Sequence, residues 1–201
     1  MREMTYMRYI YVLLTRSSTA YSRLIRAVTG DEYTHVSLGL GDGAEELYSF
    51  SRKRARLPLP SPIMREDIAG GYMSRHPRTK CALYRIRTDE RHYLAVRRRV
   101  ENMYAEQGRY HYSILGAALC KLDIAHERAE HYFCSQFVAE VLSRCGVIRL
   151  PKSASLMRPA DFARLPELEK IYSGPILYAP GAEEMFMKGA SNGQPGEARA
   201  V

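Results

Sequence analysis

The chain has 201 residues, 46% of them hydrophobic, and its 30 Lys and Arg against 22 Asp and Glu give a formal net charge of +8. This length and composition predict one domain with a proper core, spanning about residues 1–188. Because acids lie among the basic clusters, the charge does not indicate nucleic acid as a partner. A membrane surface stays open as a partner without an anchor, since no apolar run approaches the roughly 18 residues of a spanning helix.

Four cysteines occur without regular spacing: Cys81, Cys120, Cys134 and Cys145. They form neither a CxxC pair nor a disulfide framework, which favours a reducing compartment. The first ten residues include an early acid and lack an unbroken apolar stretch, so they are not typical of a signal peptide. We therefore expect a cytoplasmic protein.

The first half of the chain alternates between strand and turn patterns. Segments rich in β-branched, aromatic and leucine residues predict three strands: 5–15, 33–40 and 47–50. A short helix is expected over 17–30, and the glycine turn at 41–43 joins the second and third strands as antiparallel neighbours. Residues 52–71 contain three prolines and a Gly-Gly pair and are interpreted as an irregular insertion that could form a lid.

The second half adds a strand, two helices and a last strand, in the order 81–87, 89–107, 134–145 and 171–178. The segment 110–122 mixes aromatic and apolar residues, and its state stays open. A proline-marked turn is expected at 157–161, and residues 189–201 have the composition of a disordered tail. The fold class is predicted to be α+β, an antiparallel sheet with helices packed on it.

Cys134 lies where the amphipathic helix of the second half begins. From Phe137 onward the apolar residues recur at helical spacing along one stripe, and Gly146 ends the pattern. In the first turn of a helix, unpaired backbone N–H groups and the helix dipole favour a thiolate over a thiol. Cys134 is therefore a candidate nucleophile, and the alternative is a small buried hydrophobe.

A cysteine nucleophile needs a base, and His35 is the best placed of the six histidines. Its strand alternates so that His35, Ser37 and Gly39 share one face, while the apolar residues between them form the core face. We expect the small polar face to leave room beside the imidazole for a helix end or a substrate. The alternative is a strand histidine hydrogen-bonded to a neighbour.

His126 and His131 resemble the ligand pair of a zinc-protease helix at first sight. The spacing excludes this, because ligands on one helical face are separated by four residues and these are separated by five. With no supporting cysteine pair, no metal and no other cofactor is expected. The remaining three histidines are interpreted as surface or packing residues: His76, His92 and His111.

Two motifs and their order resemble a known family. The strand motif Thr34–Leu38, followed by Leu47–Phe50, and the helix motif Phe133–Val138 are similar to the circularly permuted NlpC/P60 (papain-like) superfamily. Ordinary members have the cysteine helix before the histidine strand, whereas this chain has the reverse order, as in the YiiX-like and lecithin-retinol-acyltransferase-like branches. The resemblance implies a papain-like fold in which Cys134 is the nucleophile and His35 the base.

The same resemblance, which covers about residues 10–178, implies a third polar residue that orients the histidine. In the family this residue comes from the strand after the turn, where Ser49 is our choice and Tyr48 and Glu46 stay open as alternatives. The backbone N–H of Cys134 would stabilise the oxyanion.

Three functions follow as expectations. The leading one is a cysteine-dependent amidase or peptidase that forms a thioacyl-enzyme on Cys134. The second uses the same dyad as an acyltransferase or thioesterase on a lipid or other acyl group, and the third is a non-catalytic binding module. The expected partner is a small peptide, amide or acyl substrate, and the sequence does not decide the oligomeric state.

Overall fold

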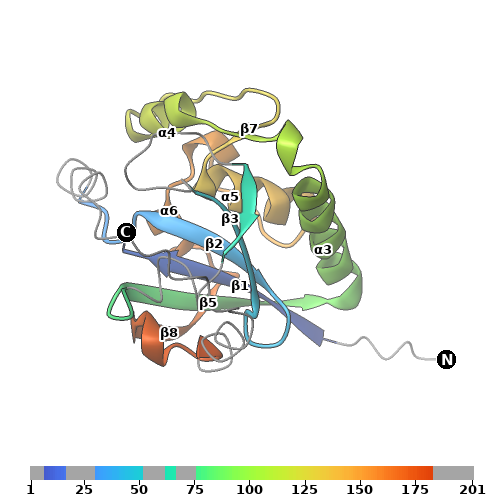
Figure 1. Ribbon diagram of the computed structural model, residues 1–201, viewed down its shortest axis with the longest axis vertical. Helices are drawn as coiled ribbons and strands as arrows, with labels where there is room; N and C mark the ends of the chain where they lie inside the picture. Colours follow the sequence, from blue (N-terminus) through green and yellow to red (C-terminus); the bar gives the residue numbers. More distant parts are fainter. Residues whose placement is uncertain (1–6, 17–29, 52–61, 67–75, 183–201) are drawn as a thin grey trace, which may run out of the picture.

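The computed structural model describes residues 7–16, 30–51, 62–66 and 76–182. At its centre is a six-stranded antiparallel sheet in the order β4-β3-β2-β1-β5-β8 (Figure 1). The strands are β1 (Met7–Thr15), β2 (His35–Leu40), β3 (Glu46–Phe50), β4 (Ile63–Arg65), β5 (Lys80–Asp89) and β8 (Glu169–Pro175). A separate parallel pair joins β6 (His111–Tyr112) to β7 (His131–Tyr132). The α+β class is confirmed.

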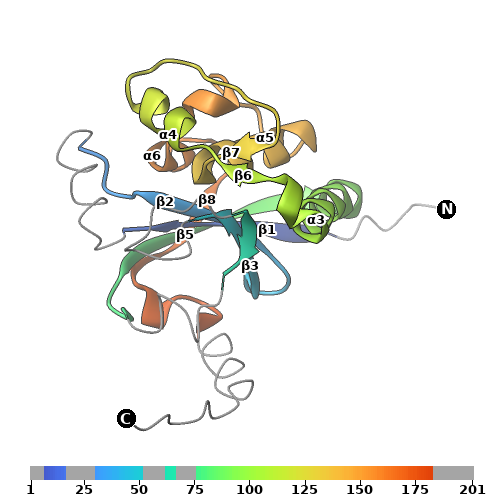
Figure 2. The ribbon, with the colours of Figure 1, turned by 45° about the horizontal axis from the view of Figure 1, so that its top comes forward.

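The described helices lie on one side of the sheet, as Figure 2 shows. They are α3 (Glu90–Ala105), α4 (Ile114–Lys121), α5 (Cys134–Arg144) and α6 (Pro159–Phe162). Val36 and Leu38 of β2 are fully buried in one core with Phe137 and Val138 of α5. The apolar face of β2 and the apolar stripe of α5 therefore meet, which places the first residue of α5 beside the start of β2.

The opposite face of the sheet is covered by the segment that follows β8. Ile176, Ala179 and Ala182 form a second core there with Leu13 and Leu47 (Figure 2). The alternation of β2 turns its small residues toward this second face.

Gly39 is a point of close approach between strands on the second face. A Cβ atom at Gly39 would lie 2.9 Å from the Tyr11 Cβ and 3.0 Å from the Ala44 Cβ, so no space for a side chain remains at this position. We expect Gly39→Ala to destabilise the fold by about 1–3 kcal/mol in urea unfolding, because the strands must move apart. Gly108→Ala is the control, since its Cβ would meet nothing within 4 Å. Equal losses in the two variants would contradict this packing argument.

Most predicted elements are confirmed with shifted ends. Asp89 caps α3 by accepting a hydrogen bond from the His92 N–H at 2.8 Å, and Gly146, with φ of 73°, follows α5. The ambiguous segment 110–122 contains β6 and then α4.

Three expectations change. The predicted turn at 157–161 contains α6, which starts at Pro159, and the last strand ends at Pro175, where the 3₁₀ turn η3 (Ile176–Tyr178) follows. The supposedly irregular segment 52–71 contains β4, which pairs with β3. Residues 52–61 and 67–71 of that segment lie outside the described residues, as do nearly all of the predicted helix at 17–30 and the predicted tail at 189–201.

Candidate active site

Cys134 and His35 meet although they are far apart in the sequence. Cys134 is the first residue of α5 and His35 the first residue of β2, and their side chains lie close enough for each to shift the pKa of the other. Both are largely shielded from solvent: Cys134 is 7% exposed and the side chain of His35 is 19% exposed.

The start of α5 directs backbone N–H groups at the sulfur. The N-cap residue, Phe133, provides no side-chain cap, and the Phe137 N–H makes the first helical hydrogen bond, to the Phe133 carbonyl. The N–H of Ser135 and that of Val36 in β2 lie close enough to the Cys134 sulfur to lower its pKa. The sulfur therefore lies at the start of a helix, where negative charge is favoured.

Glu66, directly after β4, is the acidic partner of His35. Its Oε1 accepts a hydrogen bond from His35 Nε2 at 2.8 Å, and its side chain is 9% exposed. Because Nε2 is bound to Glu66, Nδ1 is the ring nitrogen left for the Cys134 sulfur. The register of β4 on β3 holds Glu66 in place, since its backbone N–H donates to the Leu47 carbonyl at 2.7 Å.

Two buried serines surround this carboxylate. The hydroxyls of Ser37 and Ser49 donate to the same Glu66 oxygen, at 2.8 and 2.5 Å. Ser49, expected to orient His35 directly, thus lies against Glu66, and its contact with the imidazole runs through the carboxylate. The serines hold the Glu66 side chain in one orientation and stabilise its charge.

The two alternatives for the third residue lie elsewhere. The Tyr48 hydroxyl donates to Glu46 Oε2 at 3.1 Å, and Glu46 forms an ion pair with Arg97 of α3 at 3.5 Å. The Tyr48 ring packs edge-on against Tyr104, also in α3. Neither Tyr48 nor Glu46 is hydrogen-bonded to His35 in the described part of the chain.

The contacts between these groups determine their charge. Burial by itself would lower the pKa of His35, but the Glu66 carboxylate and the hydrogen bond to Cys134 outweigh it and raise that pKa to about 10. Burial by itself would raise the pKa of Cys134, but its hydrogen bond to the charged imidazole and the two backbone N–H groups lower it. Burial likewise opposes the Glu66 charge, but His35 and the serines lower the pKa of Glu66. These contacts favour an imidazolium between a thiolate and a carboxylate.

The pKa values of the other three cysteines are shifted in the opposite direction, upward. Burial raises the pKa of Cys81 to about 12 and that of Cys120 to about 11, and it also raises the pKa of Cys145. Cys134 is therefore the cysteine whose surroundings favour the thiolate.

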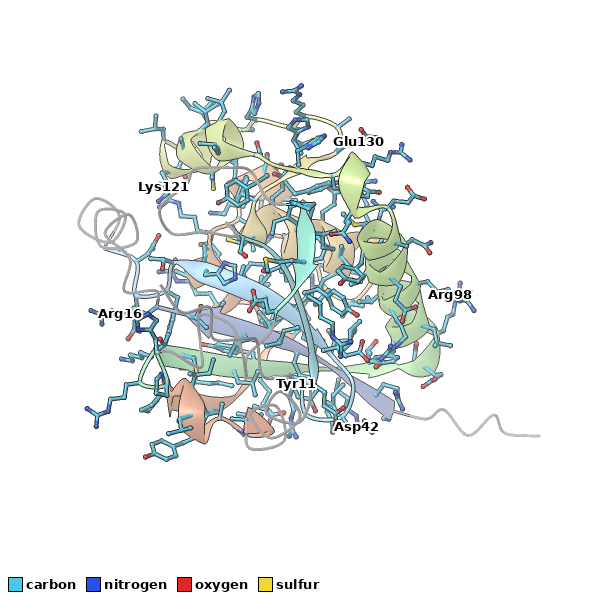
Figure 3. The ribbon with its side chains drawn as sticks, in the orientation of Figure 1. Tyr11, Arg16, Asp42, Arg98, Lys121 and Glu130 are labelled. Carbon is cyan, nitrogen blue, oxygen red and sulfur yellow. The ribbon has the colours of Figure 1, made fainter. Side chains whose placement is uncertain are left out.

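Lys121 adds positive charge on the α4 side of the site (Figure 3). Burial lowers the pKa of its ammonium group, and the charges of Asp31 and Cys134 oppose that shift. The end of α4 thus lies within electrostatic range of the thiolate.

Comparisons with known proteins add no family. The chain matches none of the protein-family models, and no curated protein has a similar sequence. In the part of the chain that the structure describes, no three His, Cys, Asp or Glu side chains are grouped to hold a metal ion, and no helix has the length and apolarity needed to cross a bilayer. The geometry around Cys134 therefore carries the functional interpretation.

Glu66 is the residue that the sequence interpretation missed. It lies in the proline-rich segment taken as irregular, and the only local signal was the short apolar pair Ile63-Met64 before it.

Proposed function

We propose that this protein is a cysteine hydrolase that cleaves an amide bond. Cys134 is the nucleophile, His35 the general acid and base, and Glu66 a positioning residue that keeps His35 oriented and charged. The observation that carries the proposal is the placement of one imidazole between the Cys134 sulfur and the Glu66 carboxylate. A nucleophile, a base and a group that orients the base are the parts that covalent catalysis by a thiol requires.

The reaction would proceed in two steps. The thiolate attacks the carbonyl carbon to form the C–S bond, while the backbone N–H of Cys134 donates to the developing oxyanion. The C–N bond then breaks, and the His35 imidazolium gives its proton to the departing amine. A water molecule deprotonated by His35 attacks the thioester, which releases the acid and regenerates the thiolate.

The order of the elements supports a circularly permuted NlpC/P60-like (papain-like) arrangement, because the His35 strand precedes the Cys134 helix in the chain. The binding-module alternative depended on a serine as a weak third residue, and the carboxylate of Glu66 removes that support. An acyltransferase or thioesterase would form the same thioacyl-enzyme and differ only in the acyl donor and acceptor.

Brief incubation with p-nitrophenyl acetate tests the nucleophile without knowledge of the natural substrate. This activated ester is expected to acetylate Cys134, because its surroundings favour the thiolate and the helix start favours an oxyanion. Peptide mass spectrometry locates the acetyl group. Cys134→Ser and His35→Ala should abolish rapid acetylation, whereas Cys145→Ser, a control at the other end of α5, should retain it.

Acetylation of Cys134 no faster than that of Cys145 would overturn the proposal. A second assay with the acetylated protein separates the two enzymatic readings. Rapid release of acetate to water supports hydrolysis, and transfer to an added amine or alcohol in preference to water supports acyl transfer.

A further inference from the structure

α4 is an apolar helix that lies on the surface. Of its eight residues only Lys121 is charged, yet Ile114 and Leu115 are 49% and 59% exposed. Leu122, at the C-cap, is 68% exposed, and Ile124 in the following loop is 50% exposed. A helix that is apolar on all sides is ordinarily buried, and a contiguous exposed apolar area marks an interaction surface. We call Ile114, Leu115, Leu122 and Ile124 the α4 patch.

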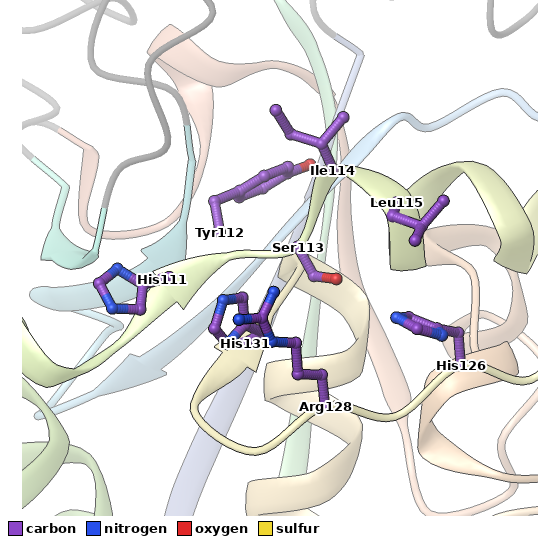
Figure 4. A pocket seen from close by; sticks show the side chains of 8 residues that line it. All are labelled: His111, Tyr112, Ser113, Ile114, Leu115, His126, Arg128 and His131. Atoms are coloured by element: carbon purple, nitrogen blue, oxygen red, sulfur yellow. The ribbon is translucent and has the colours of Figure 1, made fainter.

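A pocket of about 450 Å³ borders the α4 patch at the N-terminal end of α4 (Figure 4). Ile114 and Leu115 form part of its wall, and its other lining side chains include three histidines and one arginine: His111, His126, His131 and Arg128. The ring centroids of His111 and His131 lie 5.1 Å apart, and the His131 backbone N–H donates to the Arg128 carbonyl at 3.1 Å. No acidic residue of the described chain lines the pocket.

The acids nearest in sequence to this pocket are bound to other groups. Glu130 is paired with Arg109, Asp123 is paired with Arg158 at 2.9 Å, and Glu127 accepts a hydrogen bond from Ser153. Arg128 forms no ion pair with a carboxylate within the described ranges. Together with the positive end of the α4 dipole, this leaves a pocket that favours an anion.

We propose that the α4 patch and this pocket dock the protein onto an anionic phospholipid bilayer. A lipid phosphate occupies the pocket beside Arg128 and the histidines, while Leu115 and Leu122 enter the boundary of the acyl chains. An apolar face bordered by cationic groups is the arrangement that binds a helix in the plane of an anionic interface. A pocket of this charge without the patch would fit a soluble phosphate, and the patch without the charge would fit a second copy of the chain.

The docking does not depend on the proposed catalysis, but it gives the active site an orientation. Lys121, at the end of α4, lies within electrostatic range of the Cys134 thiolate. The bilayer would therefore be close to the nucleophile.

Sedimentation with vesicles tests the proposal on the Cys134→Ser protein, so that loss of catalysis cannot affect the result. We expect binding to phosphatidylcholine vesicles that contain about 30% phosphatidylglycerol, and weak binding to pure phosphatidylcholine. Leu115→Glu and Arg128→Glu should each lower the bound fraction about fivefold or more. Two controls should leave it unchanged: Leu177→Glu, on the other side of the sheet, and Arg98→Glu, on α3 (Figures 2 and 3).

Four outcomes would overturn this inference. Equal binding to neutral and anionic vesicles would exclude the pocket as a site for an anionic lipid. An equal loss of binding in Arg98→Glu would attribute the effect to the net charge of the protein. Binding of inorganic phosphate without binding of vesicles would indicate a soluble ligand. A concentration-dependent dimer that Leu115→Glu dissociates, with no vesicle binding, would assign the α4 patch to a second copy.

Discussion

At about pH 6, iodoacetamide is expected to alkylate Cys134 on the order of 100-fold faster than any other cysteine of the chain. Only the thiolate reacts, and the charged His35 favours the thiolate of Cys134, whereas burial raises the pKa of Cys120 to about 11 and that of Cys81 to about 12. Timed quenching followed by peptide mass spectrometry gives the four rates in one experiment. Cys145, which is partly exposed, is the most demanding comparison.

The pH dependence of the same reaction tests the ion pair. The rate at Cys134 should stay nearly constant through neutral pH and fall in acid, as the thiolate is protonated at its lowered pKa. The imidazolium persists until His35 loses its proton, at a pKa of about 10. His35→Ala removes the counterion, so alkylation should begin at higher pH. Four cysteines whose rates rise together in alkaline solution would contradict the ion pair.

Local periodicity is enough to predict where Cys134 and His35 lie. The apolar stripe from Phe137 identifies α5 and so the helix start, and the alternation of β2 separates its polar face from its core face. Both patterns extend over several consecutive residues, so they can be recognised from residues that are neighbours in the sequence. Ser49, chosen from the strand after the turn on the family resemblance, lies in β3, but its hydroxyl reaches Glu66 and not the imidazole.

Glu66 and the closeness of Gly39 to Tyr11 are set by pairing between strands. β4 has three residues, too few for a period, and only its register on β3 carries Glu66 to His35. Gly39 has no side chain, and the fold uses that absence to bring the side chain of Tyr11 close. Such tertiary contacts leave no pattern in the local sequence.

Glu66→Gln is expected to slow alkylation and acetylation of Cys134 about 10- to 100-fold at mildly acidic pH, because a change of one pKa unit alters the thiolate fraction about tenfold. The amide has no charge to favour the imidazolium, so the pKa of His35 falls, that of Cys134 rises, and the rise of the rate with pH moves to higher pH. Ser49→Ala removes only one of the hydrogen bonds to Glu66 and should slow the reaction about 2- to 5-fold. The measurement is the pH–rate profile of each variant with iodoacetamide and with p-nitrophenyl acetate.

This pair of variants decides which residue orients the base. Glutamine preserves the shape of the Glu66 side chain, and urea unfolding separates a loss of stability from a change in the pH profile. A shift in Ser49→Ala as large as that in Glu66→Gln would make the serine the dominant orienting group. An unchanged profile in Glu66→Gln would mean that the helix start alone stabilises the thiolate. Because the Glu66 carboxylate touches His35 while Ser49 touches only the carboxylate, the larger shift should belong to Glu66.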